Sequence, residues 1–127
     1  MKEQIEVRSL KQGRYVIVDD EPCTIVGMTT SKPGKHGSAK ARIDAIGIFD
    51  LQKRSVIQPV TAKIYVPIVE RKSGQVLSLS NEVIQLMDLE TYSTFEMKVP
   101  AELKDRLEVG KDVTYIESMG RRKIDMR

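Results

Sequence analysis

Apolar and polar residues alternate in short segments along the first half of the chain, and turn residues separate these segments. Ile43, for example, lies between Arg42 and Asp44, which is the pattern of a strand with one buried face. The sequence Asp-Asp-Glu-Pro at 19–22 is typical of a turn. Five or six short strands separated by turns describe a small barrel. The expected strands are 14–18, 23–28, 41–50 with a kink at Gly47, 55–60 and 62–69, and residues 5–7 are a further strand or an extended arm.

A polar stretch at 70–74 ends in glycine and is expected to connect two domains, 1–69 and 70–127. After it, residues 100–110 predict one short helix, because Pro100 suits a first turn and Gly110 a C-terminal end. Three strands, a helix and a closing hairpin follow the order of an OB-fold. The chain is therefore expected to be mainly β. The strands of this half are expected at 75–80, 83–88, 91–99, 111–118 and 121–126, with the hairpin turn at Met119 and Gly120.

Composition excludes several classes of protein. The chain has 127 residues, 5% aromatic residues and no Trp, so its core must consist of Ile, Val, Leu and Met. One Cys and one His are too few for a disulfide framework or a Cys/His zinc site. No apolar run is long enough to span a bilayer, and the N-terminus is too polar for a secretory signal. We expect a cytoplasmic protein without a bound metal and without membrane association.

The net charge of +3 is unevenly distributed. Residues 1–69 carry eleven Lys and Arg against seven Asp and Glu, whereas residues 70–127 carry ten against eleven. A local cationic patch suggests a polyanionic partner, although a solvated lysine-rich loop gives the same charge pattern.

One segment, 30–40, combines residues of unusual backbone preference with several cations, and it lies between two apolar and β-prone runs. It contains Gly34 and Gly37, Pro33 and the single histidine, His36. Glycine allows backbone angles that other residues resist, and proline fixes its own φ. We interpret the segment as a cationic hairpin connection that presents Lys35 at its middle. The cations from Ser31 onward are Lys32, Lys35, Lys40 and Arg42, with no acid among them.

Two catalytic interpretations of this segment fail. A phosphate-binding P-loop needs glycine five residues before its Gly-Lys pair and Ser or Thr after it, but the sequence has Thr29 and His36 there. A nucleophile and base pair of Cys23 with His36 lacks a third group to orient the base. Cys23 is expected to be a small buried residue, and no other residues suggest a catalytic site.

A second basic cluster, Arg121-Arg122-Lys123, lies in the closing hairpin. It is equally well explained as a solvated strand or as an RNA-contacting edge, so its role stays open. The aromatic residues that could stack on bases all lie in strand patterns, where packing is the usual role.

The ten residues Ser31-Lys-Pro-Gly-Lys-His-Gly-Ser-Ala-Lys40 closely resemble the modification loop of the translation initiation factor 5A family. The resemblance extends along the whole chain and favours the archaeal type. It implies an N-terminal SH3-like barrel followed by a C-terminal OB-fold, with hypusine or deoxyhypusine formed on Lys35. Presentation of that lysine would rest on Pro33, Gly34, His36 and Gly37, and RNA contact on Lys32, Lys35, Lys40 and Arg42.

The resemblance also implies the partners. Deoxyhypusine synthase would transfer an aminobutyl group from spermidine to Lys35, with no other cofactor. The protein, a monomer and not an enzyme, would then bind the ribosome through rRNA and peptidyl-tRNA and promote peptide-bond formation. The alternative from another class is a general single-stranded RNA-binding module that acts through the OB-fold.

Overall fold

The computed structural model describes residues 2–31 and 39–125. The fold is mainly β, and the chain divides into two compact units, Met1–Ile68 (unit 1) and Val69–Arg127 (unit 2). Each unit has a hydrophobic core of its own. No helix within the described residues is long and apolar enough to cross a lipid bilayer.

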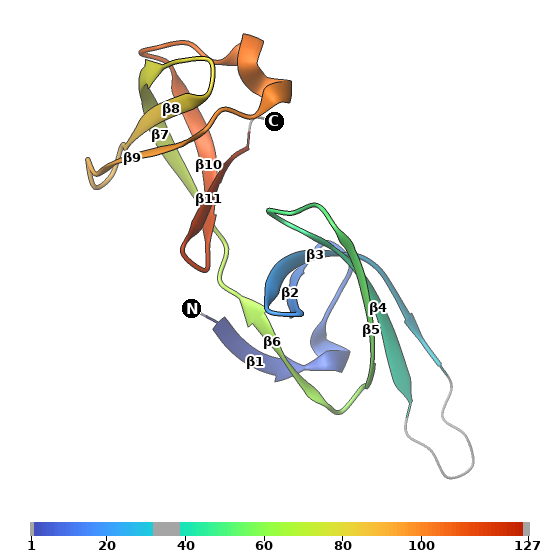
Figure 1. Ribbon diagram of the computed structural model, residues 1–127. Helices are drawn as coiled ribbons and strands as arrows, with labels where there is room; N and C mark the ends of the chain where they lie inside the picture. The colour runs from blue at the N-terminus through green and yellow to red at the C-terminus, as the bar shows by residue number, and fades with distance from the viewer. Residues whose placement is uncertain (1, 32–38, 126–127) are drawn as a thin grey trace. The chain divides into compact units, whose positions relative to one another are not determined.

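Unit 1 consists of a four-stranded antiparallel sheet and a two-stranded ribbon (Figure 1). The sheet has the order β2-β3-β4-β5, and the ribbon pairs β1 with β6. A short 3-10 helix, η1 (Val7–Ser9), follows β1 and begins at Val7, which was expected to belong to a strand or an extended arm. The strands are β1 (Lys2–Glu6), β2 (Tyr15–Val18), β3 (Glu21–Thr30), β4 (Lys40–Gly47), β5 (Lys53–Pro59) and β6 (Lys63–Pro67).

The alternation that predicted β4 is confirmed by its burial. Ala41, Ile43 and Ala45 are buried, whereas Arg42 and Lys40 are exposed on the other face. The expected extension of this strand through residue 50 is wrong. β4 ends at Gly47, whose N–H bonds to the Gln52 carbonyl and closes a turn (2.9 Å).

Cys23 is fully buried in the core of unit 1, as its sequence context predicted. Burial raises the pKa of its thiol, and the Sγ–H donates to the Glu21 carbonyl (3.3 Å). The thiol is therefore a packing group rather than a nucleophile.

Unit 2 is a curled five-stranded sheet with the order β11-β10-β7-β8-β9. Its strands are β7 (Glu70–Leu79), β8 (Val83–Asp88), β9 (Thr94–Lys98), β10 (Asp112–Ser118) and β11 (Arg121–Ile124). The expected hairpin turn at Met119 and Gly120 is confirmed, and both residues adopt positive φ angles of 51° and 79°.

One sequence-based expectation for unit 2 is wrong, and the bounds of another change. Residues 70–74 are not a connection but the first half of β7, paired with β10. Gly74 is there because Met87 and Tyr115 press against that point of the strand, and not because the chain turns. The expected short helix is confirmed, with narrower bounds, as the 3-10 helix η2 (Ala101–Arg106). Gly110 lies beyond it, at a φ of +87°, in the turn that leads into β10.

Candidate functional site: the base of the β3–β4 hairpin

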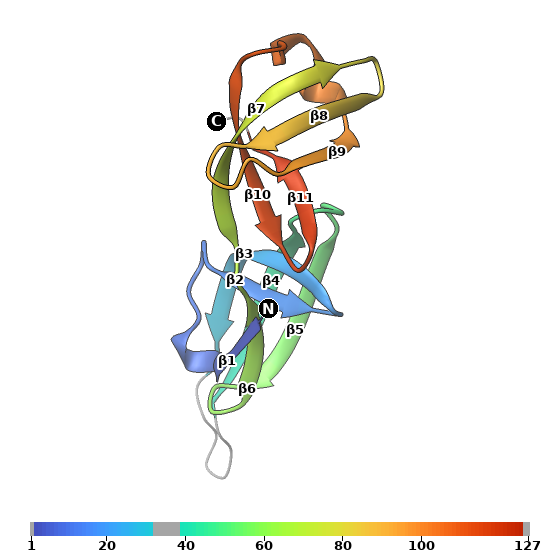
Figure 2. The ribbon, with the colours of Figure 1, turned by 90° about the vertical axis from the view of Figure 1, so that its left-hand side faces the viewer.

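The predicted modification segment lies on the hairpin of β3 and β4, which run side by side in both views (Figures 1 and 2). The residues Lys32, Pro33, Gly34, Lys35, His36 and Gly37 lie outside the described residues. The structure describes the two ends of the segment, at Ser31 and Ala39, and the strands that carry them.

Backbone pairing holds the two ends of the segment together. β3 and β4 pair as far as Thr30 and Ala41, and the Ser31 N–H then donates to the Lys40 carbonyl (2.8 Å). The Ser31 hydroxyl lies 3.2 Å from both the N and the O of Lys40. These bonds at Ser31, the residue directly after β3, hold the two sides of the hairpin together.

The β5–β6 turn supports the returning end. The Val60 N–H donates to the Ala39 carbonyl (3.0 Å). β5 pairs with β4 over its whole length, from Lys40 opposite Pro59 to Ile46 opposite Lys53. No local sequence pattern predicts the contact between Val60 and Ala39, because the two residues are far apart in the chain.

Lys40 and Arg42, both predicted to contact RNA, lie on the exposed face of β4 because buried residues alternate with them. The Arg42 Nε–H donates to a carboxylate oxygen of Asp44 (3.3 Å), and the Ser55 hydroxyl donates to the same oxygen (2.5 Å). The Ser55 hydrogen bond and the Arg42 contacts lower the pKa of Asp44. Asp44 therefore offsets part of the Arg42 charge, whereas Lys40 has no ion pair within residues 2–31 and 39–125.

The second basic cluster is organised by contacts within unit 2. The Arg122 guanidinium lies 4.3 Å from the centroid of the Phe95 ring, and its Nε–H donates to Glu117 (2.7 Å). Lys72 donates to the other oxygen of Glu117 (3.1 Å). Burial alone would raise the pKa of Glu117, but the two cations together lower it.

Several aromatic rings are in contact with other side chains. Arg122 covers one face of Phe95, and Tyr115 packs against the same ring at 5.1 Å between centroids. Tyr115 is buried, and Lys2 lies over the Tyr65 ring at 4.5 Å. Tyr92, 70% exposed, is the aromatic side chain of unit 2 most open to solvent among the described residues.

The part of the chain that the structure describes has no cluster of side chains suited to a metal ion. No group of three or more His, Cys, Asp or Glu side chains there is placed to hold a metal ion. A P-loop requires a helix after its Gly-Lys pair, but the first regular element after Gly34 and Lys35 among the described residues is the strand β4.

The chain is similar to known proteins over its whole length. The family model described as "Translation initiation factor 5A-like, N-terminal" matches residues 3–62. The model described as "Eukaryotic elongation factor 5A hypusine, DNA-binding OB fold" matches residues 68–126.

Individual relatives have the same extent. The translation initiation factor 5A of Archaeoglobus fulgidus is 67% identical over 125 residues, covering 98% of both chains. That of Methanococcoides burtonii is 66% identical over 127 residues, covering 100% of both. The solved structure of "Eukaryotic translation initiation factor 5A from Methanococcus jannaschii" superposes with a TM-score of 0.90 at 47% identity, covering 98% of this chain and 92% of that one.

Proposed function

The chain belongs to the translation initiation factor 5A family, and from this we propose that it binds the ribosome beside the peptidyl-tRNA and promotes peptide-bond formation. The proposal assigns the modified side chain, hypusine or deoxyhypusine, to Lys35. The observation that carries it is the ten-residue motif 31–40, mounted on a clamped hairpin in a chain that matches the family from end to end.

The chemistry follows from the length and charge of the modified side chain. Lysine is a flexible stem with one compact cation. An added aminobutyl group lengthens that stem and adds a second amine, which can donate to phosphate and sugar oxygens. Such contacts position a nucleic acid rather than read its sequence. Any increase in rate then comes from the orientation of the reactants on the ribosome, and the protein itself is not an enzyme.

Other parts of the proposal follow from the family. Deoxyhypusine synthase supplies the aminobutyl group from spermidine, and Pro33, Gly34, His36 and Gly37 present Lys35 to it. Lys32, Lys40 and Arg42 add electrostatic attraction to rRNA and peptidyl-tRNA. The protein acts as a cytoplasmic monomer, with the loop on an SH3-like domain of residues 1–69 and the OB-fold in residues 70–127.

Intact mass and peptide mapping of protein from its native source test the modification. We expect an added aminobutyl group, with or without a hydroxyl, on the peptide that contains Lys35. An unmodified Lys35 in that material would refute the assignment. Protein expressed in a host without the modifying enzyme provides the unmodified reference.

A reconstituted translation assay tests the function. We expect the Lys35→Arg variant, which keeps the cation, to slow peptide-bond formation on stalled ribosomes by about tenfold or more, a barrier change of ~1.4 kcal/mol. Lys104→Arg on the exposed surface of η2 is the matched control and should behave as the unchanged protein.

The alternative function, general single-stranded RNA binding through the OB-fold, makes the opposite prediction. Binding of free RNA would survive Lys35→Ala and would weaken as salt rises. The contacts of Arg122 with Phe95 and Glu117 occupy one cation and one ring face of unit 2 that such binding would use.

A further inference from the structure

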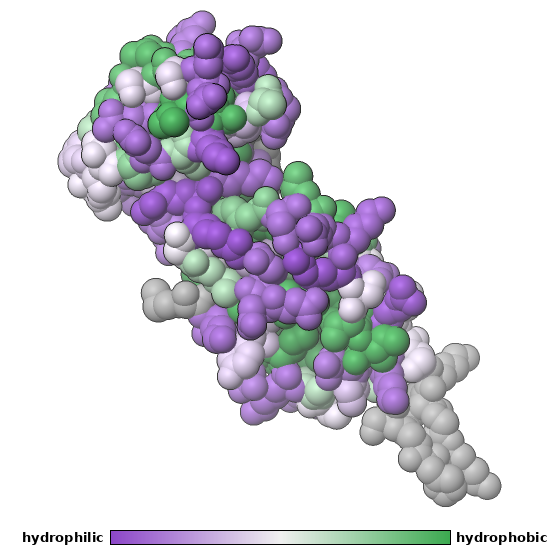
Figure 3. All heavy atoms as spheres, viewed as in Figure 1, coloured by the Kyte–Doolittle hydropathy of each residue, from purple (hydrophilic) through white to green (hydrophobic). Residues whose placement is uncertain are grey.

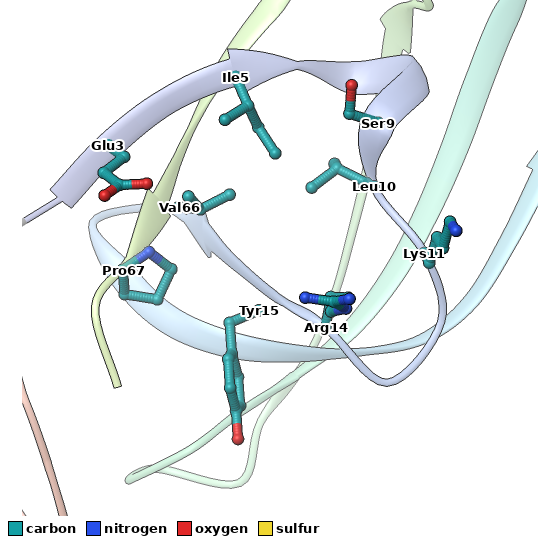
Figure 4. Close-up of a pocket in the computed structure, with 9 residues that line it drawn as sticks. All are labelled: Glu3, Ile5, Ser9, Leu10, Lys11, Arg14, Tyr15, Val66 and Pro67. Carbon is teal, nitrogen blue, oxygen red and sulfur yellow. The ribbon is translucent and has the colours of Figure 1, made fainter. Parts of the chain in front are cut away.

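A cavity of about 390 Å³ lies in unit 1, between β1, β6 and the segment that leads into β2 (Figure 4). The side chains of Ile5, Leu10 and Val66 converge on it, and Pro67 borders it beside Val66. Leu10 is only 4% exposed and belongs to the core of the unit, and Ile5 and Val66 pack against that core. The floor of the cavity is therefore a fixed, aliphatic part of the barrel.

The rim of this cavity is cationic. Lys11 and Arg14 line it and are exposed, and neither side chain has an ion pair within the described residues. Glu3, the one acidic residue of the lining, lies beside Pro67 in Figure 4. In Figure 4, Arg14 and Tyr15 lie on one side of the cavity, and Ile5 lies on the opposite side. An apolar floor thus meets two positive charges that form no ion pair within the described residues.

We propose that this cavity is a docking site for a partner protein, which inserts an aliphatic side chain flanked by acidic residues. The aliphatic side chain would remove its own surface and that of Ile5, Leu10 and Val66 from water. Acidic neighbours would complement Lys11 and Arg14, which fixes the orientation of the partner and excludes basic segments.

A protein segment fits these features better than a nucleic acid. Phosphate groups can satisfy the two cations but gain nothing from an aliphatic floor. In the part of the chain that the structure describes, β1 pairs with β6 alone, so its other edge can bond an extended peptide backbone. In protein interfaces, a few side chains that fill pockets of the partner also supply most of the binding energy.

The surface beside this cavity continues toward the base of the hairpin. A second cavity, of about 550 Å³, shares Leu10 and Lys11 with the first and reaches Thr30 and Ala39. Thr30 ends β3, and Ala39 receives the Val60 hydrogen bond described above. A partner anchored beside Ile5 can therefore extend along Lys11 to the hairpin base.

The test uses the full-length protein and a short synthetic peptide with one leucine between glutamates. Titration followed by amide NMR should shift the signals of Ile5, Leu10, Lys11 and Val66. Arg14→Glu should weaken binding about tenfold or more, because like charges then face each other. Lys53→Glu, which makes the same charge change at an exposed position of β5, should alter the affinity by less than about twofold.

A second peptide, with serine in place of leucine, isolates the apolar contribution without changing the core of the protein. We expect its affinity to be lower by about fivefold or more. Equal affinity for both peptides would overturn the proposal, as would equal effects of Arg14→Glu and Lys53→Glu. Tighter binding of oligouridylate than of the leucine peptide at the same amide signals would favour a nucleic-acid site instead and would equally overturn it.

Discussion

At the scale of single residues, a hydrogen bond joins the Tyr115 hydroxyl to the Asp88 carboxylate in unit 2. Asp88 is 4% exposed and Tyr115 is 1% exposed. One oxygen of Asp88 accepts a hydrogen bond from the Tyr115 hydroxyl, and the other accepts hydrogen bonds from the N–H groups of Glu90 and Thr91, both at 2.8 Å. A buried carboxylate is tolerated here because its oxygens are satisfied.

Removal of the Tyr115 hydroxyl should show how much this hydrogen bond contributes to the stability of unit 2. We expect Tyr115→Phe to lower the free energy of unfolding of unit 2 by about 1–3 kcal/mol, because it leaves a buried charged acceptor short of a donor. Urea unfolding followed by amide signals of β8 and β10 measures the change. Tyr65→Phe, at a ring 45% exposed, is the control and should have almost no effect.

The same pair should make stability depend on acid pH. The Tyr115 hydrogen bond, with those from the Thr91 and Glu90 backbone, lowers the folded-state pKa of Asp88 to about 2. Asp88 therefore stabilises unit 2 above its unfolded pKa of about 4, and this contribution is lost as pH falls from about 4 to 2. The stability difference between the unchanged protein and Tyr115→Phe should shrink over that range. A difference that stays constant from pH 5 to pH 2 would contradict this account.

At the scale of elements, β7 carries a glycine where a side chain has no room. A Cβ on Gly74 would lie 3.3 Å from the Met87 carbonyl oxygen and 3.4 Å from the Tyr115 ring. β7 pairs with both β8 and β10 at this point, so neither neighbour can move away freely. The glycine thus allows a close approach of backbone and ring in the middle of the sheet.

Gly74→Ala should therefore destabilise unit 2 by about 1–3 kcal/mol, the usual range for overpacking. Thermal unfolding followed by circular dichroism measures it. Gly27→Ala in β3 is the matched control, since a Cβ there meets Asp44 only at an ordinary 3.7 Å. Equal losses in the two variants would contradict the crowding explanation, because Gly→Ala also lowers the entropy of the unfolded chain, which by itself stabilises the protein.

At the scale of the whole molecule, the surface combines hydrophilic residues with patches of hydrophobic ones. Hydrophilic residues cover most of the face in Figure 3, and hydrophobic residues reach the surface in patches between them. The exposed apolar residues lie in both units, among them Ile57 at 61% and Val109 at 62%. Cations near the hairpin base differ in how far acids offset them, which bears on contact with an RNA.

Lys40 and Arg42 should therefore contribute unequally to ribosome binding. We expect Lys40→Ala to lower the salt dependence of binding by about one counterion, because its charge is not paired within the described residues. Arg42→Ala should lower it less, since Asp44 already offsets part of that charge. Lys104→Ala in η2 is the control, and an unchanged salt slope for Lys40→Ala would contradict the assignment. Sedimentation with ribosomes at several salt concentrations measures each slope.

The sequence by itself determined the mainly β fold, the approximate positions of the strands apart from the end of β4 and the start of β7, the turn at Met119 and Gly120, and the burial of Cys23. These features depend on local patterns, because alternation and turn residues act over a few neighbouring positions. The ten-residue motif predicted a modification segment for the same reason. It is contiguous in the chain.

Only the tertiary structure decided which distant residues meet. The sequence assigned 70–74 to a connection, because the reason for Gly74 lies in Met87 and Tyr115, which press on it from other strands. It also could not distinguish the 3-10 helix η2 from an α-helix, since Leu103 and Leu107 are buried in either case. The Asp88–Tyr115 bond, the Arg122–Phe95 contact and the cavity beside Ile5 likewise join residues far apart in the chain. Such contacts depend on packing between strands, which no local pattern records.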